Sequence, residues 1–108
     1  MRMWMVDPKI LCRRHLLGEH VELHMLVGHL KRGRRVDGWA DSNCTQPRSI
    51  AARHKALARE MARRGYRHAS PLMQPSVAAH QRPGATVDVA AAQAELVRRC
   101  ADCAGRAE

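Results

Sequence analysis

Two groups near the start of the chain have residue types that could do covalent chemistry. The first is the α-amine of Met1, which we expect to be retained because Arg2 is too large for the usual removal of an initiator methionine. α-Amines are less basic than lysine side chains, so they are partly neutral and nucleophilic near neutral pH. Such an amine can attack the C1′ carbon of a sugar and form an imine. The second group is Glu22, whose carboxylate could stabilise positive charge on the sugar and then move the proton that β-elimination removes.

A helix is needed to hold Glu22 in place, and the segment from Pro8 to Leu30 predicts one. Pro8 suits a first helical turn, and apolar residues then recur at steps of three and four. The stripe that we expect to be buried consists of Leu16, His20, Leu23, Val27 and Leu30. Glu22 lies on the flank of that stripe, on a line that it shares with His15, Glu19, Met25 and His29.

The other segments predict two more helices joined by long loops. Met1 to Val6 suggests a short extended arm, with Trp4 packed in the core rather than stacked on a base. A second helix is expected from Pro47 to Gly65, with a buried seam at Ile50, His54, Leu57 and Met61. Thr86 or Asp88 would cap a third helix that runs to about Cys103. Residues 36–46 and 66–85 have no helical period and predict loops. We therefore expect an all-α fold, a compact single domain of about three helices that spans residues 1–108.

Positive charge is concentrated in the first three quarters of the chain. The formal net charge is +9, and residues 1–80 contain 15 of the 19 Lys and Arg residues but only 6 of the 10 Asp and Glu residues. This distribution favours a polyanionic partner, with nucleic acid ahead of an anionic membrane surface. The strongest candidates for phosphate contact are the four cations of the run 31–35, because neutralising a helix end needs only one or two. The second helix adds a basic face made of Arg53, Lys55, Arg59, Arg63 and Arg64.

Cysteine and histidine residues raise the question of a metal site. Cys100 and Cys103 have the spacing of a ligand pair, but no second pair follows at a familiar distance. His20 and His24 are one helical turn apart, yet His20 falls on the apolar stripe. Buried free thiols and a packed imidazole are the preferred interpretation, so we expect no metal ion and no cofactor.

The chain has no apolar run long enough to span a membrane and no secretory signal pattern, which favours the cytoplasm and reduced thiols.

Several of these residues form a pattern that resembles a known family. The pattern is His15-Leu16-x-x-Glu19-x-x-Glu22-Leu23, with Arg2 beside the starting amine and a second basic helix that ends in Arg64-Gly65-Tyr66. It resembles the endonuclease V family of phage pyrimidine-dimer DNA glycosylases with abasic lyase activity, over roughly residues 1–72. The resemblance implies a few packed helices, the amino-terminal amine of Met1 as nucleophile and Glu22 as the catalytic acid.

The chain also departs from that family. Two arginines that flank the catalytic glutamate in the family correspond to Val21 and Met25, and the family's aromatic, basic tail is replaced by a neutral one. Cyclobutane dimers are the lesion that the resemblance implies, with other damaged or modified bases as alternatives.

Together, the residues and the resemblance imply a DNA repair glycosylase and abasic lyase that acts on damaged pyrimidines in duplex DNA. We expect a monomer associated with the nucleoid, possessing the phage family's chemistry and no cofactor. The expected DNA contacts are Arg2, Arg13, Arg14, His15, Lys31, Arg32, Arg34, Arg35, Arg53, Arg59 and Arg63. The alternatives are a non-catalytic basic DNA-binding protein on the same scaffold, a His/Cys metal-binding module, and a basic tether for RNA or an acidic protein. The tether is disfavoured because two Trp and one Tyr make a poor stacking surface.

Overall fold

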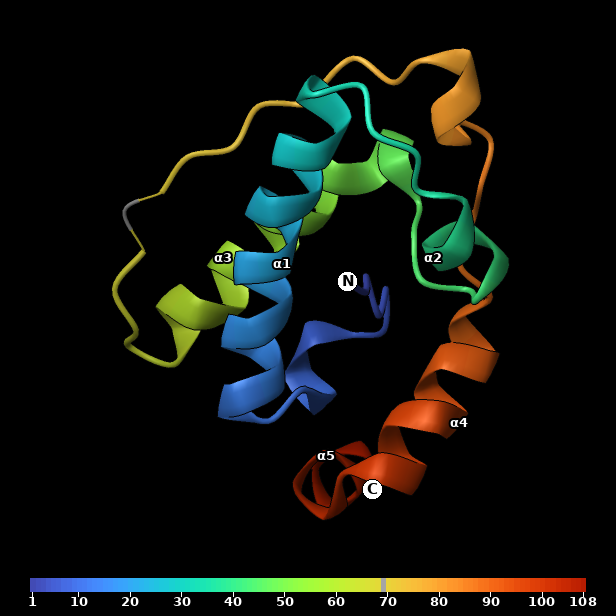
Figure 1. The fold of residues 1–108 in the computed structure, drawn as a ribbon. Coiled ribbons are helices and arrows are strands. Elements are labelled where there is room, and N and C mark those ends of the chain that lie inside the picture. Colours follow the sequence, from blue (N-terminus) through green and yellow to red (C-terminus); the bar gives the residue numbers. More distant parts are fainter. Residues whose placement is uncertain (69) are drawn as a thin grey trace.

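The amino-terminal arm runs through the interior of the protein. The structure, a computed structural model, describes residues 1–68 and 70–108. The chain begins near the centre of the molecule (Figure 1), where Met3, Trp4 and Val6 are buried. The Met3 N–H donates a hydrogen bond of 2.7 Å to the Cys44 carbonyl, which ties the arm to a loop 41 residues later. The expected packing of Trp4 in the core is confirmed, but the arm is not extended throughout, because Met5 has a φ of +59°.

The helix that contains Glu22 begins later than its sequence predicts. Pro8–Ile10 form a single 3-10 turn (η1), and α1 spans Arg13–Lys31. The predicted continuous helix from Pro8 is therefore wrong. Leu11 and Cys12 have extended backbones, and this break turns both side chains into the core, where Leu11 is fully buried. The predicted stripe of α1 is confirmed, since all five of its members are buried.

The second predicted helix is present, with short helical turns around it. A helix of five residues, α2 (Asp37–Asp41), lies within the segment that was predicted to be a loop. Pro47–Ser49 form a 3-10 turn (η2) that leads into α3 (Ile50–Arg63). The seam predicted for α3 is buried as expected. Gly65 ends this element with a φ of +82°, a value that favours glycine because it has no Cβ.

The carboxy-terminal segment contains two helices instead of the single one that was predicted. After a 3-10 turn at Ala79–Gln81 (η3), α4 spans Val89–Arg99 and α5 spans Ala101–Ala107. The Asp88 side chain caps α4 by accepting a hydrogen bond from the Ala91 N–H, as one of the two predicted caps. Cys100 separates the helices because its backbone is extended, with φ −131° and ψ 109°. The hydrophobic spacing continues across this break, so sequence periodicity could not reveal it.

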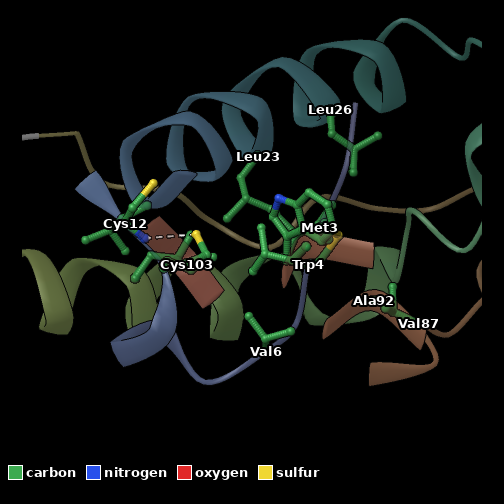
Figure 2. Packing of buried hydrophobic residues seen from close by; sticks show 14 of the residues in the cluster. Met3, Trp4, Val6, Cys12, Leu23, Leu26, Val87, Ala92 and Cys103 are labelled. Carbon is green, nitrogen blue, oxygen red and sulfur yellow. Dashed lines mark hydrogen bonds between the residues drawn. The ribbon is translucent and has the colours of Figure 1, made fainter. Parts of the chain in front are cut away.

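The core lies between α1, α3, the arm and the carboxy-terminal helices. Figure 2 shows Trp4 and Met3 below α1 beside Leu23 and Leu26, with Ala92 of α4 nearby. α1 packs against α3, and α5 packs against η1 at the other end of the chain. The radius of gyration is 13.5 Å, close to the roughly 13 Å expected for a compact domain of this length. The described residues contain no strand, so the predicted all-α class is confirmed. No helix among them is long and apolar enough to cross a membrane.

Candidate active site

A hollow of about 220 Å³ lies where the amino-terminal arm passes α1. It is lined by side chains of the arm, of the first turns of α1 and of the end of α4, namely Arg2, Trp4, Arg14, His15, Gly18, Glu19, Glu22 and Arg99. Three larger hollows, of about 470, 590 and 570 Å³, lie along the connection between α3 and α4 and contain no carboxylate. A fourth, of about 360 Å³, lies beside the start of α1 and contains Asp102, but no residue of the amino-terminal arm lines it. We place the candidate chemistry in the smaller hollow, which brings a carboxylate and the arm together.

Glu22 and the start of the chain meet in this hollow. The backbone N–H of Arg2 donates a hydrogen bond of 3.3 Å to Glu22 Oε2, between residues 20 positions apart. Arg2 is the residue that follows the Met1 amine, so that amine is at most a few ångströms of covalent chain from the bonded N–H. Glu22 is partly exposed and forms no salt bridge with any described residue. Its carboxylate is therefore available to a ligand.

Aromatic rings hold the arm in this position. The Arg2 guanidinium lies over the Trp4 ring, 4.4 Å from its centroid. That ring in turn meets His15 edge-on, with 6.0 Å between the ring centroids. Burial and the nearby Arg14 lower the pKa of His15, and Glu22 opposes that shift. Arg2 and Arg14 make the rim of the hollow positive, which suits a phosphate-bearing ligand, whereas Arg99 on the same rim is paired with Glu95 at 2.5 Å.

A buried ion pair supports the site from below. Glu19 is one turn before Glu22 on α1 and is 1% exposed. Arg53 of α3 binds it through two hydrogen bonds, Nε to Oε2 at 2.5 Å and Nη2 to Oε1 at 2.9 Å. The third contact of Arg53 is a 2.6 Å hydrogen bond from Nη1 to the carbonyl of Val6. Burial raises the pKa of Glu19, and the bond from Arg53 opposes that rise. This arginine thus joins α1, α3 and the arm.

Two arginines that the sequence predicts on the exposed basic face of α3 point into the fold instead. Arg53, predicted to contact DNA, is only 5% exposed and forms an ion pair with Glu19. Arg64 points back across the fold, with Nη2 donating to the Leu11 carbonyl at 2.7 Å and Nε donating to Glu60. Both were placed wrongly on the exposed face for the same reason: buried carboxylates and backbone carbonyls elsewhere in the chain bind these guanidinium groups. Contact between Arg53 and DNA stays a prediction. Helical periodicity does not report such distant partners.

The other predicted DNA contacts lie on the surface, in three places. Lys31, Arg32, Arg34 and Arg35 are exposed around the end of α1, and Arg35 pairs with Asp37 at 2.8 Å. Arg13 is exposed and its guanidinium lies 4.6 Å from the centroid of the Tyr66 ring. Arg59 and Arg63 are exposed on α3. Hydrogen bonds from Arg63 and Arg64 lower the pKa of Glu60 to about 2, despite its burial. As DNA contacts, these cations stay predictions.

Val21 and Met25 stand where the resemblance implies arginines. Both side chains are about half exposed, at 54% and 51%. The positions next to Glu22 therefore face solvent, as phosphate-binding positions would, but they offer apolar surface instead of charge.

Two clusters of possible metal ligands lie beside the candidate site. One consists of imidazoles. The ring centroids of His20, His54 and His68 are within 4.9 Å of one another, and His24 lies at the edge of the group. The other brings Cys12 and His15 to Cys100 and Cys103. The sequence indicated no second ligand pair for Cys100 and Cys103. That expectation is wrong, because Cys12 and His15, each 88 positions earlier, lie beside them. The sequence signal was present as Cys12-x-x-His15, but nothing in the sequence connects it with the other pair.

Comparison with known proteins places the candidate site in a family. A family model for pyrimidine dimer DNA glycosylases matches residues 1–74, which include the arm, α1 and α3. The chain belongs to the pyrimidine dimer DNA glycosylase family. No curated protein and no solved structure matches the chain at a significant level.

Family membership confirms the resemblance seen in the sequence and supports a general role as a pyrimidine dimer DNA glycosylase, with DNA as the substrate. The match contains Arg2, Glu19, Glu22 and Arg53, but it ends before α4 and α5. The segment that contributes Arg99 to the hollow and Cys100 and Cys103 to the thiol cluster therefore lies outside the matched region.

Proposed function

We propose that this protein removes damaged pyrimidines from duplex DNA and cleaves the resulting abasic site, with the Met1 α-amine as nucleophile and Glu22 as the acid. The observation that carries this proposal is the 3.3 Å hydrogen bond from the Arg2 N–H to Glu22 Oε2, inside a hollow with a positive rim. It puts the start of the chain beside an uncommitted carboxylate. Family membership supports the same substrate class.

The chemistry begins at C1′ of the damaged nucleotide. The neutral amine forms a bond to C1′ while the bond to the base breaks, and the base leaves with that electron pair and takes up a proton. Glu22, on the face of α1 that lines the hollow, stabilises the positive charge that develops on the sugar. The nitrogen then loses protons as the C1′–O4′ bond opens and O4′ is protonated, which gives an imine.

Cleavage of the strand follows from the imine. Glu22 removes a proton from C2′, the electron pair moves toward the imine, and the 3′ phosphate leaves. Water then hydrolyses the imine and frees the amine. A residue with no salt bridge suits this double role, because its carboxylate must accept and release protons without breaking a structural contact.

Access to C1′ requires a distorted duplex. Displacing a base costs a few kcal/mol and is easiest where a lesion already weakens stacking, so selectivity can begin at that step. The rim arginines 2, 14 and 99 and the cations at the end of α1 would contact phosphates on either side of the lesion.

Borohydride trapping tests the proposal. The protein would be incubated with duplex DNA containing either a cyclobutane dimer or an abasic site, then reduced, and the adduct digested and located by mass spectrometry. We expect a covalent adduct on the Met1 α-amine. A variant with two residues added before Met1 should lose trapping, whereas the same extension after Glu108 should not.

Two outcomes would contradict the proposal. Trapping on a lysine side chain would identify a different nucleophile. Intact binding to damaged duplex without any adduct or strand cleavage would instead favour a non-catalytic DNA-binding protein on this scaffold.

A further inference from the structure

Four potential metal ligands from the two ends of the chain converge beside the start of α1. They are the thiols of Cys12, Cys100 and Cys103 and the imidazole of His15. Cys12 Sγ lies 3.2 Å from His15 Nδ1 and 3.9 Å from Cys100 Sγ, and Cys103 Sγ lies 3.6 Å from His15 Nδ1. All four ligand atoms are within 4.8 Å of one another. The three cysteines are buried, and His15 is half-buried.

Three of the six separations are close to the edges of a tetrahedral zinc site, and the other three are within 4.8 Å. With Zn–S bonds of about 2.3 Å and Zn–N bonds of about 2.0–2.1 Å, a regular tetrahedron places two sulfurs about 3.8 Å apart and a sulfur and a nitrogen about 3.6 Å apart. The observed S–S distance of 3.9 Å and S–N distances of 3.2 and 3.6 Å differ from those values by a few tenths of an ångström at most. Small side-chain rotations would place all four atoms around one ion.

The local backbone supports the same interpretation. Each ligand pair has two residues between its members, as in Cys12-x-x-His15 and Cys100-x-x-Cys103, a spacing typical of structural zinc sites. In each pair, the first member precedes a helix and the second lies in its first turn. The Cys12 N–H donates to Cys103 Sγ at 3.2 Å, and the Cys103 N–H donates to Cys100 Sγ at 3.5 Å (Figure 2 shows the first of these bonds). Such N–H groups stabilise thiolates that bind a metal.

We propose that Cys12, His15 Nδ1, Cys100 and Cys103 bind one Zn²⁺ ion that fastens α5 to the start of α1. Binding is not a redox step: three thiols lose protons to solvent, the imidazole binds in its neutral form, and the product is a Zn–S₃N complex with net charge −1. The proposal replaces the sequence expectation of no metal and does not depend on the proposed glycosylase activity.

This ion would fix a part of the chain that lies outside the family match. Arg99, which lines the candidate hollow, immediately precedes Cys100. Residues 75–108 are not covered by the family model, yet their return to α1 completes the rim of that hollow. A metal at the junction of α4 and α5 would hold Arg99 at that rim.

The experiment measures zinc in protein purified under reducing conditions. We expect one zinc ion per chain by elemental analysis, and a Co²⁺-substituted protein with the intense visible bands of a tetrahedral thiolate site. Cys100→Ser and Cys103→Ser should lose stoichiometric zinc. Cys44→Ser is the matched control, because Cys44 is also a buried free cysteine but is outside the cluster, and it should keep the metal.

A thiol count on the wild-type protein keeps the test decisive if a serine variant does not fold. Removing zinc with a chelator should make three more thiols reactive, and adding zinc back should protect them again. Wild-type protein that takes up neither Zn²⁺ nor Co²⁺ under reducing conditions would overturn the proposal. It would also be overturned if a Cys12–Cys100 disulfide formed in zinc-loaded protein, or if His54→Asn removed the metal while Cys100→Ser retained it, since the ion would then belong to the histidine cluster.

Discussion

Glu19 and Glu22 lie one turn apart on the same helix, but the fold gives them opposite environments. Glu19 is buried, and both of its oxygens are bound by Arg53. Glu22 is partly exposed, accepts one long backbone hydrogen bond from the arm and has no salt bridge with a described residue. Three helical steps of about 100° leave the two side chains offset by about 60° around the axis, and this offset is enough for one carboxylate to meet α3 and the other the hollow.

This difference shows how a small domain can prepare a reactive carboxylate. A buried charge is tolerable only when it is paired, so Glu19 and Arg53 are tied to the structure that they hold together. Arg53 of that pair also binds the Val6 carbonyl and so helps to position the arm, which contacts Glu22 nearer its start. Glu19 thus helps to place the start of the chain, and Glu22, the proposed acid, has no salt bridge with a described residue. The following predictions test this division, beginning with the largest expected effect.

Glu22→Gln should abolish most catalysis and leave the fold intact. We expect strand cleavage at an abasic duplex to fall about 10²- to 10⁴-fold, the usual contribution of a general acid or base. The free energy of unfolding should change by less than about 1 kcal/mol, since a glutamine oxygen can still accept the Arg2 hydrogen bond. Single-turnover cleavage and urea unfolding measure the two effects. Unchanged cleavage would show that Glu22 is not the acid.

Arg53→Met should have the opposite effect, because its main consequence should be a loss of stability. Removing one partner of a buried ion pair leaves Glu19 uncompensated, which typically costs about 3–5 kcal/mol. Chemical denaturation should detect this loss. Arg59→Met, on the exposed side of the same helix, is the control and should change stability by no more than about 0.5 kcal/mol. Equal effects of the two substitutions would mean that the buried pair is not a structural support.

The cluster of histidines on α1, α3 and the segment after α3 should also make the protein sensitive to acid. Burial, and then the neighbouring histidines 54, 68 and 24, lower the pKa of His20 to about 4 from an ordinary value of 6.5. The unfolded chain therefore binds a proton more readily than the folded protein between these two values. This contribution to stability is complete above pH 6.5 and is lost as the pH falls toward 4, by on the order of 3 kcal/mol.

The measurement for this prediction is the free energy of unfolding between pH 7 and pH 4. His20→Leu should flatten the dependence, because an apolar residue fits the buried stripe and does not titrate. His80→Asn, at an exposed histidine, should leave the dependence as steep as in the wild type. A wild-type protein equally stable at both ends of the range would contradict the assignment of a buried, neutral imidazole.

Local patterns in the sequence were sufficient for the buried faces of α1 and α3 and for one side of the site. The buried stripe of α1, the seam of α3 and the anchoring role of Trp4 all follow from spacing and residue type, and each is confirmed. The family motif around Glu22 is likewise local, and the family match confirms the resemblance. Errors arose where the chain changes direction within a continuing apolar period, at Leu11–Cys12 and at Cys100.

Residue pairing was decided only by the tertiary structure. The sequence placed Arg53 on a basic surface, but the fold buries it against a glutamate 34 residues earlier. The sequence also offered no partners for Cys100 and Cys103, although Cys12 and His15 lie against them in the fold. Amino-acid order fixes periodicity, charge and local motif, because these depend on neighbours within a few turns. Which charge meets which counter-charge, and which ligand pair meets another, depends on how helices far apart in the chain pack, and no short-range pattern encodes that.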